Sequence, residues 1–94
     1  MSGKTDLVIF GAGGDLARRK LFPALYQLDR AELLDSSVRI AAVARGELTT
    51  PDFLEQTELL LKEAVGDNWD KQVWKRFSQR LQYLRIDFSF RQQF

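Results

Sequence analysis

A glycine-rich turn between an apolar run and a helix-forming segment constrains this chain more than any other feature. The apolar residues 7–10 (LVIF) lead directly into residues 11–14 (GAGG), and Asp15 follows at the start of the helix-forming segment. Such a sequence can hold a phosphate group, because the first N–H groups of a helix are unpaired and carry roughly half a unit of positive charge. Glycines permit positive φ angles and let the backbone approach the anion closely. The stretch therefore predicts a phosphate-binding turn.

The glycine spacing alone leaves two interpretations open. Gly11 and Gly13 fit the first half of the dinucleotide-binding pattern G-x-G-x-x-G, but Leu16 stands where the third glycine would fall. An ordinary glycine-rich turn between a strand and a helix is the less favoured alternative for these residues. A longer match is needed to choose between them.

Residues 11–26, GAGGDLARRKLFPALY, resemble the opening signature of the glucose-6-phosphate dehydrogenase family. The resemblance continues more loosely through residues 40–45 (IAAVAR), Trp69 and residues 86–87, so it extends over the whole chain. It covers only the N-terminal part of what a member of that family contains. The resemblance favours the phosphate-binding interpretation of the turn.

The turn is expected to bind the pyrophosphate of NADP through its main chain. The expected contacts are Gly11, Gly13, Gly14, Asp15 and Leu16. The Asp15 carboxylate is expected to cap main-chain donors of the same turn, since its charge would otherwise repel the phosphate. A cap without any cofactor contact is the alternative role for Asp15.

Arg45, which follows the second predicted strand, is the other candidate for cofactor recognition. An Asp or Glu at this place binds the ribose 2′-hydroxyl of NAD, whereas an arginine can bind the 2′-phosphate of NADP with two hydrogen bonds. In the family that the chain resembles, a small hydroxyl residue often follows this arginine; here Gly46 and Glu47 follow. We therefore expect NADP as the cofactor. Gly46, which lacks the hydroxyl group, and the acidic Glu47 are expected to weaken its preference over NAD. The alternative is a solvated loop arginine.

The resemblance also assigns roles to other charged residues. Lys20 matches a family lysine that lies near both cofactor and substrate, and Asp87 matches a strand-end aspartate to which we assign a structural role. Arg18 and Arg19 are interpreted as solvated surface residues. No catalytic residue and no metal site is expected in the chain.

The pattern of apolar residues predicts an α/β fold, the first half of a Rossmann-like parallel sheet in the truncated order β-α-β-α-α-β. Strands are expected at residues 6–10, 38–44 and 82–88, and helices from 14 or 15 to about 31, from 51 to about 66 and from 68 to 80. Unbroken apolar runs predict strands that are buried on both faces. Pro23 is expected to kink the first helix near residues 21–22. Thr50 is expected to cap the second helix, and the two tryptophans to pack in the core.

Composition excludes several classes of protein. The chain has 94 residues, 45% of them hydrophobic, with a net charge of +1 and no cysteine. A disulfide scaffold and a thiolate metal site are thereby excluded, and nucleic acid and membranes are not expected as partners. No apolar run approaches the ~20 residues that span a bilayer, and the N-terminus lacks an apolar signal core. A cytoplasmic location is therefore expected.

The absence of histidine bears on activity. The family that the chain resembles uses a histidine to take the proton from the sugar hydroxyl, and this chain has none. We therefore expect residues 1–94 to be the N-terminal portion of a dinucleotide-binding domain, inactive alone, with the catalytic domain absent. The resemblance implies a homo-oligomeric parent that oxidises glucose 6-phosphate to the 6-phosphogluconolactone with hydride transfer to NADP, in the pentose phosphate pathway. The alternative functions are a stand-alone nucleotide-binding or regulatory module and another Rossmann oxidoreductase.

Overall fold

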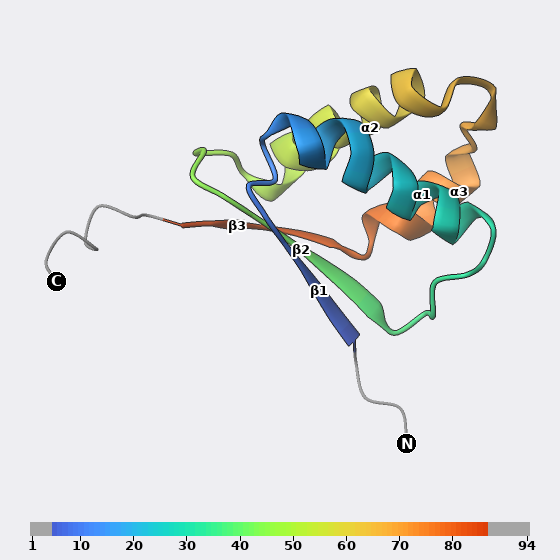
Figure 1. Ribbon diagram of the computed structural model, residues 1–94, viewed down its shortest axis with the longest axis horizontal. Helices are drawn as coiled ribbons and strands as arrows, with labels where there is room; N and C mark the ends of the chain where they lie inside the picture. The colour runs from blue at the N-terminus through green and yellow to red at the C-terminus, as the bar shows by residue number, and fades with distance from the viewer. Residues whose placement is uncertain (1–4, 87–94) are drawn as a thin grey trace, which may run out of the picture.

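The computed structural model describes residues 5–86, in which helices cover one face of a three-stranded sheet (Figure 1). The elements are β1 (Thr5–Phe10), the π-helix η1 (Ala17–Leu21), α1 (Phe22–Arg30), β2 (Val38–Ala44), α2 (Thr50–Val65), the 3₁₀-helix η2 (Gly66–Asn68), α3 (Lys71–Ser78) and β3 (Leu81–Arg85). The predicted α/β class and the order β-α-β-α-α-β are confirmed. None of the helices in this part of the chain combines the length and the apolar character needed to cross a membrane.

The sheet is parallel, and β2 lies between β1 and β3. Leu7 pairs with Ile40 across β1 and β2, and Ile40 pairs with Leu81 across β2 and β3. Each connection returns through a helix to the other end of the sheet, as parallel strands require. The carboxyl ends of all three strands therefore meet at one edge.

The core lies between the sheet and the helices. Its fully buried side chains include Ile40 from β2, Phe22 and Tyr26 from α1, and Phe77 from α3. Phe22 and Tyr26 share one helix face, because residues four apart stack on the same side. The ring of Trp69 stacks on Tyr26 with centroids 5.6 Å apart, so the prediction of a core role is confirmed for this tryptophan. Trp74 likewise packs against the core.

The prediction that the strands are buried on both faces is wrong for β1. Val8 is 50% exposed and Phe10 is 73% exposed, because within residues 5–86 no helix covers the second face of the sheet. Val43 also lies on this face, yet it is only 5% exposed, since Phe10 and Leu84 flank it on the neighbouring strands. An apolar run indicates which residues avoid water, but it does not indicate what covers them.

Pro23 has the predicted effect on the first helix. The backbone widens into η1 directly before α1, and Pro23 lies in the first turn of α1. A proline is tolerated there because the first N–H groups of a helix have no partner within it. The predicted second segment with Pro23 close to its start is therefore confirmed, and the kink near residues 21–22 stays a prediction.

Several predicted boundaries differ from the structure: β1 begins at Thr5 and not at residue 6, and α3 ends at Ser78 and not at residue 80. The cap of α2 is Thr49 and not Thr50: Thr49 Oγ1 accepts a hydrogen bond from the Asp52 N–H at 3.2 Å. Helix α3 begins at Lys71 and not at residue 68, because the Asp70 carboxylate accepts from the N–H group of Gln72 at 2.7 Å. β3 begins one residue earlier than predicted, and its predicted end at residue 88, together with Asp87, lies outside the described residues.

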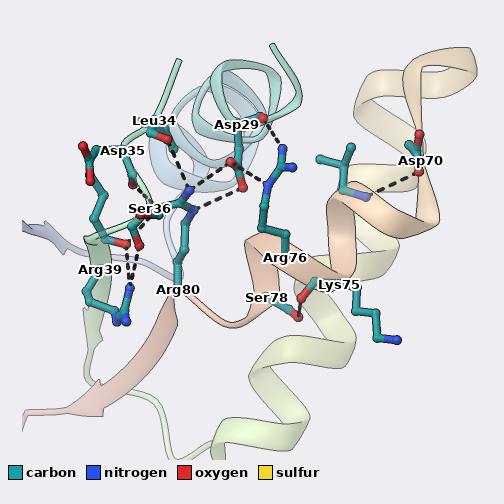
Figure 2. Close-up of polar contacts among 12 residues, drawn as sticks. Asp29, Leu34, Asp35, Ser36, Arg39, Asp70, Lys75, Arg76, Ser78 and Arg80 are labelled. Carbon is teal, nitrogen blue, oxygen red and sulfur yellow. Dashed lines mark hydrogen bonds and ion pairs between the residues drawn. The ribbon is translucent and has the colours of Figure 1, made fainter. Parts of the chain in front are cut away.

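A buried ion pair joins the ends of three elements (Figure 2). Arg80, just before β3, is 5% exposed, and its guanidinium lies against the carboxylate of Asp29 in α1, which is 1% exposed. Arg80 also donates to the carbonyl oxygens of Asp35 at 2.7 Å and Val38 at 3.0 Å. This network fixes the amino end of β2 relative to α1 and β3, at the opposite edge of the sheet from the glycine turn.

Candidate functional site

The glycine turn has a closed geometry. The N–H of Gly14 donates to the carbonyl oxygen of Gly11 at 2.8 Å, and the N–H of Arg18 donates to that of Gly14 at 3.1 Å. Gly11 has a φ of +71°, in the region that residues with a side chain rarely adopt. A side-chain carbon added at Gly14 would lie 3.3 Å from the Gly11 oxygen. The turn therefore depends on glycine at position 11 and is tight at position 14.

The turn is docked against the carboxyl end of β2. The N–H of Ala12 donates to the carbonyl oxygen of Val43 at 3.0 Å, and Ala12 itself is buried. Arg45 stands two residues after Val43, with an exposed side chain. The turn and the loop after β2 thus share one edge of the sheet (Figure 1).

A cavity of about 160 Å³ opens between this turn, the end of β2 and α2. Its lining residues are Ala12, Gly13, Arg18, Phe22, Ala44, Gly46, Leu48, Phe53, Gln56, Thr57, Leu60 and Tyr83. Most of the lining is apolar, and polar groups come from the turn, Arg18, the loop after β2, Tyr83, and Gln56 and Thr57 of α2. An apolar lining with a few polar groups is typical of small-molecule sites.

Tyr83 closes the cavity on the side of β3. Its hydroxyl donates to the carbonyl oxygen of Gly46 at 2.6 Å, and the side chain is 8% exposed. Its ring lies 5.0 Å from that of Phe53. The loop that follows Arg45 is therefore held by a side chain from the neighbouring strand.

The predicted site residues do not all gather at the cavity. Gly13 lines it, and Gly11 and Gly14 form the turn at its mouth. Leu16 and Lys20 are exposed and do not line it within residues 5–86.

Asp15 lines a neighbouring hollow between the turn and α2, together with Arg18 and Glu63. Leu16, the residue before η1, makes no side-chain cap. Within residues 5–86, the Asp15 carboxylate accepts no hydrogen bond, so the expected capping bond is not seen.

Sequence reasoning missed two residues of the cavity wall. Arg18, interpreted as a solvated residue, lines both the cavity and the hollow beside it. Its place in the first helical turn after the glycines could have indicated this, since that turn faces the bound group in phosphate-binding loops. Tyr83 gave no signal, because its contact with Gly46 depends on strand register.

Two charged side chains, Arg85 and Glu47, pair at the loop after β2. Arg85, at the end of β3, lies 3.5 Å from the carboxylate of Glu47, and both side chains are largely exposed. Arg85 pairs with Ala44 in the sheet, so it stands beside the residue that precedes Arg45. Exposed pairs of this kind are weak. We expected the negative charge of Glu47 to lower the attraction of this loop for an anion. The positive charge of Arg85 thus partly offsets that negative charge.

A parallel sheet in which the first strand leads through a glycine turn into a helix, beside the end of the second strand, defines the Rossmann-like dinucleotide-binding class. Within residues 5–86, no group of acidic, histidine or cysteine side chains could hold a metal ion. The site instead offers main-chain N–H groups and guanidinium groups, which suit phosphate.

Comparison with known proteins identifies the family. Residues 8–94 match the family described as glucose-6-phosphate dehydrogenase, NAD binding domain, and the chain belongs to this family. The chain is 39% identical over 82 residues to the glucose-6-phosphate 1-dehydrogenase of Buchnera aphidicola subsp. Schizaphis graminum, a match that spans 87% of the chain and 17% of that relative. It is 40% identical over 82 residues to the enzyme of Dickeya dadantii, again over 87% of the chain and 17% of the relative.

Solved structures agree with this assignment. The crystal structure of glucose-6-phosphate 1-dehydrogenase from Mycobacterium avium superposes with a TM-score of 0.80 at 39% identity, over 89% of this chain and 18% of that one. A glucose-6-phosphate dehydrogenase in complex with its substrate glucose-6-phosphate gives a TM-score of 0.76 at 32% identity, over 94% of this chain and 19% of the other. The chain thus spans less than a fifth of the length of these relatives.

Proposed function

We propose that this chain is the NADP-binding N-terminal portion of a dinucleotide-binding domain in a glucose-6-phosphate dehydrogenase. The observation that carries the proposal is the shared edge of the glycine turn and the loop after β2, linked by the bond from Ala12 to Val43. A pyrophosphate bound at the turn places its adenosine ribose beside the end of the second strand. Arg45 follows that strand, and a guanidinium group there suits a 2′-phosphate better than a hydroxyl.

Different parts of the site would bind different parts of the cofactor. The main chain at Gly11, Gly13, Gly14, Asp15 and Leu16 would face the pyrophosphate. The Gly14 N–H already donates to the Gly11 carbonyl oxygen, so Gly14 would contribute close approach of the backbone and not a donor. Lys20 would lie toward the substrate side, and Arg18 would add positive charge near the phosphates. The cofactor supplies the hydride acceptor; the chain's own residues bind and orient it.

The parent protein would oxidise glucose 6-phosphate at C1 and pass the hydride to NADP. The histidine that takes the sugar proton in this family has no counterpart among the 94 residues. We therefore propose that the catalytic and substrate-binding residues belong to a longer polypeptide and that the 94-residue chain shows no dehydrogenase activity alone. A cytoplasmic location and a homo-oligomeric parent stay predictions.

The test compares two nucleotides that differ only in the 2′-phosphate. Binding of adenosine 2′,5′-bisphosphate and of 5′-AMP to the 94-residue chain is measured by NMR titration, with Arg45→Glu as the variant. We expect the chain to prefer the bisphosphate and Arg45→Glu to remove roughly tenfold or more of that preference, as for the loss of a charged hydrogen bond. Arg39→Glu is the matched control, since Arg39 is an exposed arginine at the other end of β2.

Two results would contradict the proposal. A chain that binds neither nucleotide, or both equally, does not recognise the 2′-phosphate. A preference that survives Arg45→Glu would show that another group makes this contact. In the complete enzyme, the same substitution is expected to shift kcat/KM from NADP toward NAD.

A further inference from the structure

We infer that Tyr83 is a positioning residue for cofactor recognition: its hydroxyl holds the loop that carries Arg45, and it thereby contributes to the discrimination of NADP from NAD. This inference rests on the proposed function of Arg45. Tyr83 is not expected to touch the cofactor phosphate itself. It acts through the main chain of Gly46, the residue next to Arg45.

The loop is fastened at three points. At its start, the carbonyl oxygen of Ala44 accepts a hydrogen bond from the N–H of Ile86 at 2.8 Å. At its end, Thr49 caps α2. Between these anchors, the Tyr83 hydroxyl donates to the Gly46 carbonyl oxygen at 2.6 Å. This is the one of these three bonds that acts on the residue directly after Arg45, and the exposed ion pair between Arg85 and Glu47 adds a weaker contact one residue further on.

Tyr83 can hold the loop because its own ring is fixed. The side chain is 8% exposed, packs against the ring of Phe53 at 5.0 Å and belongs to the wall of the cavity beside Gly13. A rigid aromatic ring places its hydroxyl with little conformational freedom, so the position of the Gly46 carbonyl is well defined. Preorganised contacts of this kind raise affinity because less ordering remains to be done on binding.

Gly46 and Tyr83 are sterically matched. A side-chain carbon added at Gly46 would lie 3.2 Å from the Tyr83 hydroxyl oxygen, closer than ordinary van der Waals contact. A larger residue at position 46 would therefore press on this hydroxyl and displace the loop. Removing the hydroxyl would make room for it. The two positions should consequently show coupled effects on binding.

The experiment uses the NMR titration with adenosine 2′,5′-bisphosphate and 5′-AMP on four proteins: the natural chain, Tyr83→Phe, Gly46→Ala, and the combination of both. Alanine adds the side-chain carbon at position 46 without a hydroxyl that could itself bind the phosphate. Tyr83→Phe is expected to reduce the affinity for the bisphosphate roughly threefold to tenfold and to change that for 5′-AMP less, as for the loss of one neutral hydrogen bond. Gly46→Ala is expected to lower the same preference in the natural background. It is expected to have a smaller effect, or none, in the Tyr83→Phe background.

Tyr26→Phe provides the matched control. The Tyr26 hydroxyl also bonds to main-chain groups, accepting from the Asp70 N–H at 2.8 Å, but it lies between α1 and α3. This variant should lose stability without any change in the ratio of the two affinities. A purely structural role of Tyr83 would give the same pattern and would overturn the inference.

The outcomes separate this inference from the proposed function. A natural chain without preference for the bisphosphate overturns both. A natural preference that depends on Arg45 but is untouched by Tyr83→Phe overturns only the positioning role. Equal effects of Gly46→Ala in the two backgrounds would also overturn it, because the contact between positions 46 and 83 would then be irrelevant to binding.

Discussion

Arg80 and Asp29 form a two-point ion pair in the interior: Nε lies 3.2 Å from Oδ2, and Nη2 lies 3.1 Å from Oδ1. Arg76 adds a third contact, from its Nε to Oδ1 of Asp29 at 3.1 Å. Such pairs contribute little net stability compared with an apolar pair of similar shape, but breaking one leaves an uncompensated buried charge. The carboxylate and guanidinium are therefore needed together.

Asp29→Ala is expected to destabilise the chain by about 3–5 kcal/mol, because Arg80 would remain buried without a counter-ion. Urea unfolding followed by circular dichroism measures this. Glu58→Ala is the control, since Glu58 forms an exposed pair with Lys62 at 3.6 Å and should lose less than about 1 kcal/mol. Equal effects of the two substitutions would show that burial of the Asp29 pair has no energetic consequence.

Alkaline pH should weaken the fold through Tyr26. Burial is the main reason that the pKa of Tyr26 is raised above its ordinary value of 10.0. The unfolded chain then loses this proton first, so the contribution to stability is full below about pH 10 and falls as the pH rises through the pKa of the folded state. We expect urea midpoints to fall between pH 9 and pH 11.

Tyr26→Phe isolates this contribution. The variant should be less stable at neutral pH by about 1–3 kcal/mol, because the main-chain groups of Asp70 lose their partner. Its stability should, however, decline less steeply toward high pH than that of the natural chain. Contributions from every other group are shared by the two proteins and cancel in the comparison. Parallel pH profiles would contradict the assignment.

Gly11 and Gly13 should respond differently to alanine. Gly11→Ala places a side chain on a backbone with φ of +71° and is expected to cost about 1–2 kcal/mol. Gly13 has no positive φ of this kind, and a side-chain carbon there would meet nothing within 4 Å, so Gly13→Ala should be nearly neutral for stability. Thermal unfolding of both variants checks this. Similar losses would mean that the turn relaxes at position 11.

The open face of the sheet should make the isolated chain self-associate. Val8, Phe10 and Leu84 expose large apolar side chains on this face, and contiguous apolar surface of this kind favours association. Phe10→Ser is expected to raise the concentration at which light scattering detects oligomers. Leu33→Ser is the control, because Leu33 is equally exposed but lies in the loop before β2. An unchanged threshold for Phe10→Ser would exclude the sheet face as the contact surface.

The sequence predicted those features of the fold that depend on local chemistry. The bounds of β2 match the prediction, since a segment that is apolar except for Arg39, between a serine loop and a glycine, has few alternatives. The effect of Pro23 was predictable because a missing N–H acts within its own turn. Thr49 and Thr50 are both adequate caps, so only the geometry could distinguish them. The open face of β1 and the contact between Tyr83 and Gly46 depend on partners far away in the sequence, which no local pattern reveals.

The order of the strands restricts how this sheet can be enlarged. Within residues 5–86, β1 is hydrogen-bonded on one side only, to β2. A further parallel strand added along its outer side would point its carboxyl end at the glycine turn from the flank opposite β2. The turn would then change from a border of the molecule into the floor of a cleft with two walls, which is where ligands of open α/β sheets bind.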